Sequence, residues 1–218
     1  MNTFDTVCHA KVRLGGTYLH RCHVMDGQKY VCMDELSNDI ENQQCIVYSF
    51  GIGGDWTFED TIASFGCKVY AYDPTIERPN FRSKNITFKN IGLSELAKND
   101  TFQVLSKIIN ENGHTNTKIS YVEMDIEGAE LSGLPIWIES GLLNNVQQIG
   151  MEVHLGGNNA MFRLRFLETL RNLQLKGNFR IFNWEANNCW KNLKRNDQYF
   201  SLAELAFKKI NTKSSCSR

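Results

Sequence analysis

The sequence lacks several features that would place it in a broad class at once. It has no net charge, because 24 lysines and arginines balance 24 aspartates and glutamates, so nothing electrostatic indicates a nucleic-acid partner. No apolar run approaches the roughly 18 residues that a membrane-spanning helix needs. The N-terminus shows no basic segment followed by an apolar core, so we expect no signal peptide. From this chain alone we expect no nucleic-acid partner, no membrane span and a cytoplasmic location, and nothing indicates the oligomeric state.

The seven cysteines include no C-x-x-C pair. Three of them, Cys8, Cys22 and Cys32, lie near three histidines, but their spacing fits no closed four-ligand zinc site. We therefore expect no metal, and either packing or a disulfide among these three. Cys45 and Cys67 begin two predicted neighbouring strands, where apolar packing is the default for a buried cysteine.

Strand and helix patterns alternate from residue 45 onward. Residues 1–44 read as an appendage in which Asp26-Gly27, flanked by apolar runs, predicts a two-residue hairpin turn. Residues 45–218 read as the main domain, with helices predicted at 56–65, 101–112 and 161–175 and a short helix broken near Pro135. Strands are predicted at 45–50, 67–72, 86–91, 119–124, 146–153, 179–184 and 202–210.

The connections between these strands predict the architecture. Helices and loops join the first five strands, whereas a loop alone joins the last two. We therefore predict an α/β fold with a seven-stranded, mostly parallel sheet, an antiparallel edge hairpin and helices on both faces.

A glycine-rich turn follows the first predicted strand. Gly51 and Gly53 let the backbone turn tightly before a helix, which is the arrangement of a nucleotide site. A dinucleotide fingerprint needs a third glycine where Trp56 stands, which disfavours NAD and FAD, and the absence of G-K-[S/T] excludes a P-loop.

Carboxylates follow two further strands of the predicted sheet. Asp73 comes 22 residues after Gly51, where a carboxylate can accept hydrogen bonds from ribose hydroxyls, although Asp73-Pro74 could also be a simple turn. Asp125 and Glu127 follow the fourth strand. Ligands in open α/β sheets bind outside the carboxyl ends of the strands, so both should face the ligand.

Gly51-Ile-Gly-Gly-Asp55 resembles motif I of the class I S-adenosylmethionine-dependent methyltransferases. Together with Tyr-Asp-Pro and Met-Asp-Ile-Glu-Gly-Ala-Glu, it resembles the FkbM-type methyltransferases, and it looks closest to the animal methyltransferase-like protein 24 group. The resemblance covers roughly residues 45–210. It implies a Rossmann-like methyltransferase domain, S-adenosyl-L-methionine as cofactor, and often an oxygen acceptor. It implies these cofactor-binding residues: Phe50, Gly51, Gly53, Asp55, Asp73, Ser94, Asp125 and Glu127.

Transfer to a hydroxyl also requires loss of its proton. His154, at the end of the fifth strand, is the best candidate base, although capping the sheet is as good an explanation of it. Asp125 could be the base or could orient the cofactor's amino group, while Glu127 and Glu130 could instead cap the following helix. We take His154 and Asp125 as the catalytic candidates.

The acceptor stays open between a small molecule, a glycan hydroxyl and a protein side chain. A non-catalytic binding protein with this fold is the alternative function, and an NAD-dependent oxidoreductase is the third. Family members often carry an N-terminal anchor, so the resemblance favours the secretory pathway, as the cysteine count does.

Overall fold

The computed structural model describes residues 7–77, 82–96, 101–154, 160–186 and 202–210. Within them, the main sheet has seven strands in the order β12-β13-β11-β10-β5-β6-β7. Five strands pair in parallel, and β13 runs antiparallel to both of its neighbours, which confirms the predicted α/β fold. The strands are β5 Ile46–Phe50, β6 Lys68–Tyr72, β7 Ile86–Lys89, β10 Tyr121–Met124, β11 Gln148–His154, β12 Phe179–Ala186 and β13 Leu202–Lys209.

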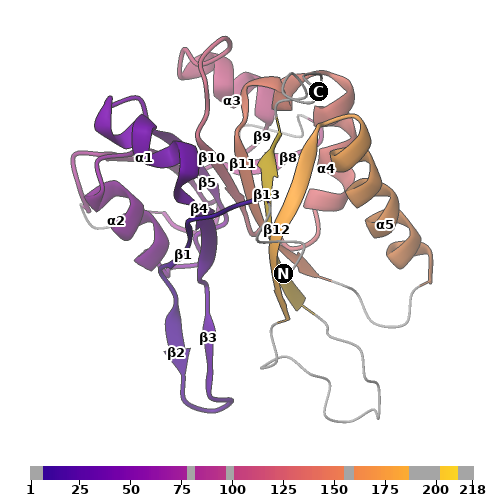
Figure 1. The fold of residues 1–218 in the computed structure, drawn as a ribbon, viewed down its shortest axis with the longest axis horizontal. Coiled ribbons are helices and arrows are strands. Elements are labelled where there is room, and N and C mark those ends of the chain that lie inside the picture. The colour runs from indigo at the N-terminus through magenta and orange to yellow at the C-terminus, as the bar shows by residue number, and fades with distance from the viewer. Residues whose placement is uncertain (1–6, 78–81, 97–100, 155–159, 187–201, 211–218) are drawn as a thin grey trace, which may run out of the picture.

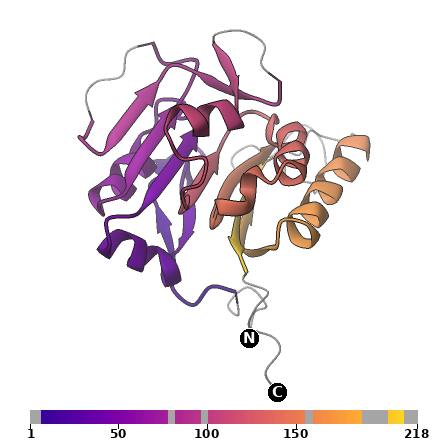
Figure 2. The ribbon, with the colours of Figure 1, turned by 90° about the horizontal axis from the view of Figure 1, so that it is seen from above.

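Helices cover both faces of the sheet (Figure 1), and the view from above shows the same two layers (Figure 2). Each face of the sheet packs against helices in its own hydrophobic core, and β5 contributes side chains to both. Tyr48 and Phe50 pack on the side of α3, α4 and α5, whereas Val47 packs on the side of α1 and α2. No helix in the described ranges is long and apolar enough to cross a membrane. The helices are α1 Met33–Glu41, α2 Thr57–Ser64, α3 Leu105–Glu111, α4 Glu130–Glu139 and α5 Ala160–Leu175, with a 3₁₀ turn at Leu142–Asn145.

Several predicted boundaries were wrong. The predicted break at Pro135 does not occur, since α4 runs through it with Leu134 and Trp137 buried against the sheet. The helix expected from residue 101 begins at Leu105 instead. Before it, strand β9 (Phe102–Val104) pairs in parallel with β8 (Gly92–Ser94). Helix α1 was not predicted at all.

The predicted turn at Asp26-Gly27 was also wrong. The N-terminal hairpin consists of β1 (Lys11–Leu14) paired with β4 (Lys29–Cys32) and β2 (Thr17–Leu19) paired with β3 (Val24–Asp26). The pairing of β2 with β3 continues the register of β1 with β4, so the four strands form a single two-stranded arm. Its tip lies at residues 20–23, and it projects from the body of the protein in Figure 1. Gly15, Gly16 and Gly27, all with positive φ, interrupt this arm instead of closing a turn.

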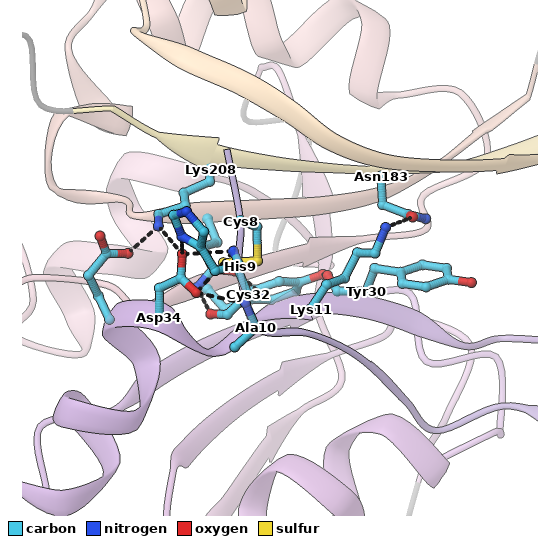
Figure 3. Close-up of a disulfide and its surroundings, with 12 residues drawn as sticks. Cys8, His9, Ala10, Lys11, Tyr30, Cys32, Asp34, Asn183 and Lys208 are labelled. Carbon is cyan, nitrogen blue, oxygen red and sulfur yellow. Dashed lines mark hydrogen bonds and ion pairs between the residues drawn. A yellow bond between two sulfur atoms is a disulfide. The ribbon is translucent and has the colours of Figure 1, made fainter. Parts of the chain in front are cut away.

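The base of the hairpin is bonded both to the segment that precedes it and to the main sheet (Figure 3). A disulfide joins Cys8 to Cys32. The Cys32 backbone exchanges two hydrogen bonds with the Gln148 side chain of β11, at 2.8 and 2.7 Å. Lys208 of β13 donates to Asp34 at 2.9 Å, and two backbone N–H groups before the hairpin also donate to that carboxylate. Buried side chains of the described N-terminal segment also pack with the sheet, since Leu14, Val31 and Leu36 share one core cluster with Val47 of β5.

A second disulfide joins Cys45 to Cys67, whose Cα atoms are 4.6 Å apart. The expected neighbourhood of these two residues is confirmed, but the expectation of simple packing was wrong. Lys68 N–H donates to the Cys45 carbonyl at 2.9 Å, which holds the starts of β5 and β6 in register. Cys22 is disulfide-bonded as well.

Candidate functional site

A cavity of about 490 Å³ opens at the carboxyl ends of β5, β6 and β10. We call it the strand-end cavity. It has the size of a small-molecule site, and it lies where an open parallel sheet binds ligands. Six of the residues predicted from the sequence line it: Gly51, Gly53, Asp73, Ser94, Asp125 and Glu127.

Phe50 and Asp55, which were also predicted to bind the cofactor, are not among the lining residues. Phe50 is fully buried and stacks on Tyr72, with ring centroids 5.2 Å apart. Asp55 accepts hydrogen bonds from the Thr57 N–H at 3.0 Å and from the Thr17 hydroxyl at 2.9 Å. It therefore stabilises the start of α2 and ties the hairpin to it, and its contact with a cofactor stays a prediction.

The glycines of the turn serve two different purposes. Gly51 has φ of +88°, and a Cβ there would lie 1.8 Å from the Asp125 carbonyl oxygen, so close backbone packing requires glycine. Gly53 and Gly54 also have positive φ, but a Cβ on either would meet nothing within 4 Å. The space beside these two is therefore available to a ligand.

Asp73 connects the glycine turn to the end of β6. One carboxylate oxygen accepts the Gly53 N–H at 2.8 Å, and the other accepts the N–H and the hydroxyl of Thr75 at 2.7 and 2.6 Å. A carboxylate offers about four acceptor positions, so one position is left for a ribose hydroxyl. Accepting a second hydroxyl requires the Thr75 hydroxyl to turn away.

The wall formed by β8 and β9 is mostly apolar. Leu93 and Phe102 line the cavity here together with Pro74. Ser94 is the polar exception, because its hydroxyl is buried, only 4% of the residue is exposed, and it has no hydrogen-bond partner among the described residues. A buried hydroxyl without a partner is costly, so Ser94 is suited to meet a polar atom of a ligand.

Asp125, Glu127 and His154 meet where β10 and β11 end side by side. Glu127 Oε2 lies 3.0 Å from His154 Nε2, and Glu127 has a positive φ of 57° that turns the chain into α4. The Glu127 side chain is 83% exposed, so it is free to move. Glu130 is fully buried and accepts the Ile126 N–H at 2.8 Å, and burial raises its pKa. His154 contacts Glu127 but does not itself line the cavity.

Sequence reasoning missed a buried polar network behind the site. Lys29 of β4, only 5% exposed, lies 2.9 Å from Glu204 and 3.3 Å from Glu123. Burial alone would lower the pKa of Lys29, but these carboxylates hold it well above its ordinary value, so the lysine stays charged. The one signal in the sequence was the position of Lys29 two residues before Val31, on the buried face of its strand.

Ser49 lies between two further carboxyl groups of this network. Its hydroxyl is 2.5 Å from Glu59 and 2.9 Å from Glu123, yet it carries a single hydrogen to donate. One of the two carboxyl groups must therefore be protonated to complete both bonds. Burial raises the pKa of Glu59 to about 7, and that of Glu123 well above its ordinary value, in agreement with this count.

Comparison with known proteins gives one family match. A family model described as "Methyltransferase domain" matches residues 3–201, which includes the N-terminal hairpin. The human protein named "Probable methyltransferase-like protein 24" is 29% identical over 174 residues, covering 70% of this chain and 46% of that protein. Its rat counterpart is 30% identical over 139 residues, covering 57% and 38% respectively. The chain thus spans less than half the length of the curated relatives it matches.

Two solved structures illustrate more distant similarity. A chain of the fibrillarin/Nop5p complex is 12% identical with a TM-score of 0.47, covering 89% of this chain and 90% of that one. Sp1610 of Streptococcus pneumoniae, in complex with S-adenosyl-L-methionine, is 11% identical with a TM-score of 0.42, covering 83% and 75%.

Proposed function

The chain belongs to the methyltransferase domain family, and on this premise we propose that it transfers a methyl group from S-adenosylmethionine to an oxygen atom of an acceptor. The observation that carries the proposal is the convergence of six predicted cofactor residues on one cavity at the strand ends. The resemblance implied these residues from separate motifs, and their meeting in a single cavity supports the assignment.

The residues present fit this cofactor. The open space beside Gly53 and Gly54 leaves room for its amino-acid end, and the carboxylates of Asp125 and Glu127 complement its positive charges. Asp73 has one acceptor position left for the ribose. Leu93 and Phe102 offer an apolar surface to the adenine, beside the unpartnered hydroxyl of Ser94.

When bound, the cofactor supplies a methyl carbon that its sulfonium already activates. The protein must then align an acceptor oxygen with that carbon and take up the proton of the hydroxyl. Asp125 lines the cavity and can orient the donor's amino group. His154 does not line the cavity, but its Nε2 lies 3.0 Å from Glu127, which does, so a proton taken up by Glu127 can pass to the imidazole.

A binding experiment tests the cofactor assignment independently of the unknown acceptor. Calorimetry with S-adenosylhomocysteine should give one site per chain. Ser94→Ala should weaken that affinity by roughly 5- to 10-fold, the value of about one hydrogen bond. The unfolding free energy should not fall, because the lost hydroxyl has no hydrogen-bond partner among the residues that the structure describes.

Ser64→Ala is the matched control, since Ser64 is exposed on α2 and its hydroxyl donates only to the nearby Thr61 carbonyl. It should bind like the wild type. Absence of heat with both S-adenosylhomocysteine and S-adenosylmethionine would overturn the proposed function. Binding without turnover across sugars and small hydroxylated acceptors would favour the non-catalytic alternative.

A further inference from the structure

Three metal-ligating side chains converge beside the strand-end cavity. Asp125 and Glu127 follow β10, His154 ends β11, and these two strands are parallel neighbours with Met124 opposite Met151. One ligand atom from each of the three lies within 4.8 Å of the other two. The group therefore comes from adjacent strand ends, not from one flexible loop.

The convergence offers oxygen and nitrogen electron pairs from three side chains. His154 Nε2 lies 3.0 Å from Glu127 Oε2: in one tautomer Nε2–H donates to the carboxylate, and in the other the Nε2 lone pair is available to a cation. Glu152 Oε2 lies 3.8 Å from Nε2 on a side chain that is nine-tenths buried, and burial raises the pKa of Glu152 to about 8. Acceptors facing one another at these distances repel unless a proton or a cation lies between them.

No lysine or arginine within the described residues forms an ion pair with Asp125, Glu127 or Glu152. Lys29, the buried lysine nearby, already pairs with Glu123 and Glu204. Among the described residues, the site thus combines carboxyl groups and an imidazole nitrogen with no lysine or arginine in ion-pair contact.

We propose that Asp125, Glu127 and His154 bind a divalent cation at the mouth of the strand-end cavity. Two carboxylate oxygens and one imidazole nitrogen form a mixed set of the kind that binds Mn²⁺ and related first-row ions. The exposed Glu127 side chain can turn to close the coordination. From the sequence we expected no metal, because only the N-terminal cysteines and histidines suggested a metal site and their spacing did not fit one.

The other candidate cluster is different. Cys8, Cys32 and Asp34 also lie close together, but the two cysteines form a disulfide and so offer no thiolate to a metal.

The cation site rests on the proposed function for its role. Asp125 and Glu127 line the strand-end cavity, so a cation held by them would lie at the edge of the space assigned to the cofactor, within reach of an acceptor that approaches the methyl group. An acceptor hydroxyl bound to the cation gives its proton to water more readily, because the positive charge stabilises the alkoxide. The oxygen's electron pair then forms the bond to the methyl carbon, the carbon–sulfur bond breaks, and its pair stays on sulfur. His154 is then a ligand, and the cation replaces it as the group that promotes loss of the proton.

Manganese binding tests the site without any acceptor. Protein treated with a chelator and dialysed is titrated with Mn²⁺, and free Mn²⁺ is followed by electron paramagnetic resonance. We expect one bound ion per chain, and roughly tenfold or greater weakening in Glu127→Gln and in His154→Gln. Glu41→Gln, an exposed carboxylate at the end of α1, is the matched control and should bind like the wild type.

Each outcome decides the proposal. No bound Mn²⁺, or the same affinity in the two site variants as in the control, overturns it. Because Glu127 is exposed, its variant should keep the wild-type unfolding free energy, so a loss of binding there is not a loss of fold. Calorimetry with S-adenosylhomocysteine on the same samples separates the two hypotheses. Protein that binds S-adenosylhomocysteine but no Mn²⁺ contradicts the cation site alone. Protein that binds Mn²⁺ but no S-adenosylhomocysteine contradicts the proposed function alone.

Discussion

At the scale of single residues, the glycine turn contains two different constraints that look identical in the sequence. Gly51 is required because the Asp125 backbone occupies the place of its Cβ. Gly53 is constrained only by its backbone angle, since the space around it is open. A motif written as G-x-G therefore combines a structural position with a position that is available to a ligand.

Alanine substitutions should separate these two roles. Gly51→Ala forces its Cβ into a carbonyl oxygen and should lower the unfolding free energy by about 3 kcal/mol or more, as steric strain in a core does. Gly53→Ala adds only the cost of a left-handed residue, about 1 kcal/mol. Urea unfolding measures both.

Gly53→Ala should affect the affinity for S-adenosylhomocysteine more than it affects the unfolding free energy. Gly53→Ala places a methyl group in the space assigned to the cofactor, so it should weaken binding in a protein that remains folded. Equal stability of the two variants would contradict the role given to Gly51, and unchanged affinity in Gly53→Ala would contradict the role given to Gly53.

At the scale of elements, the sequence predicted the regular parts of the sheet well. Most of the seven strands have apolar, β-branched or aromatic runs, which can be recognised without knowing the partner strand. The hairpin turn predicted at Asp26-Gly27 was wrong because this dipeptide also fits a bend between β3 and β4, two successive segments of one arm. The helix break predicted near Pro135 was wrong because the stabilisation from burying Leu134 and Trp137 outweighs the loss of the hydrogen bond that a proline removes.

The site was predictable only in part, for a related reason. Residues that follow strands in a parallel sheet reach one edge whatever the details, so Asp73 and Asp125 could be brought together from their positions alone. The contact between Glu127 and His154 depends on a positive φ and on the register of two strands, neither of which the residue types specify. Lys29 was missed because it comes from a segment that had been set apart from the sheet.

The polar network that joins β5, α2 and β10 predicts an unusual pH dependence of stability. Burial raises the pKa of Glu59 to about 7 in the folded protein, from an ordinary value of 4.5. The folded state then holds the proton more tightly than the unfolded state. The protonated Glu59 therefore adds to the unfolding free energy. This stabilisation is fully present below pH 4.5 and is lost as the pH rises through 7, by at most about 3 kcal/mol.

Glu59→Gln should flatten this dependence, because a glutamine stays neutral at every pH. The measurement is the unfolding free energy from urea titrations between pH 5 and 8, for the wild type and the variant. Glu168→Gln, on the exposed side of α5, is the control and should keep the wild-type slope. Asp34 does not confound the comparison: burial alone would raise its pKa, but hydrogen bonds lower it to about 2, so its contribution is lost only in stronger acid. Parallel slopes for wild type and Glu59→Gln would show that Glu59 is ionised in the folded protein.

At the scale of the whole molecule, the N-terminal hairpin is tied to the far strands of the sheet. Cys32 is bonded to Gln148, Lys208 to Asp34, and Lys29 to Glu204, so residues far apart in the chain meet on β11 and β13. The family model also extends over this segment. The division into an appendage at 1–44 and a domain at 45–218 stays a prediction, and a substitution at Lys29 tests it.

Lys29→Met removes the cation from a buried group that keeps Glu123 and Glu204. Breaking a buried ion pair on one side typically costs about 3–5 kcal/mol, because the remaining carboxylates are left without compensation. We expect that loss in the unfolding free energy, and partial recovery in Lys29→Met with Glu204→Gln, since the second change removes one of those carboxylates. Lys11→Met, on the same hairpin but exposed and bonded to Asn183, should cost less than about 1 kcal/mol. If residues 1–44 were an independent appendage, Lys29→Met would leave the main unfolding transition unchanged; a single cooperative transition that shifts with Lys29 makes the hairpin part of the domain that carries the site.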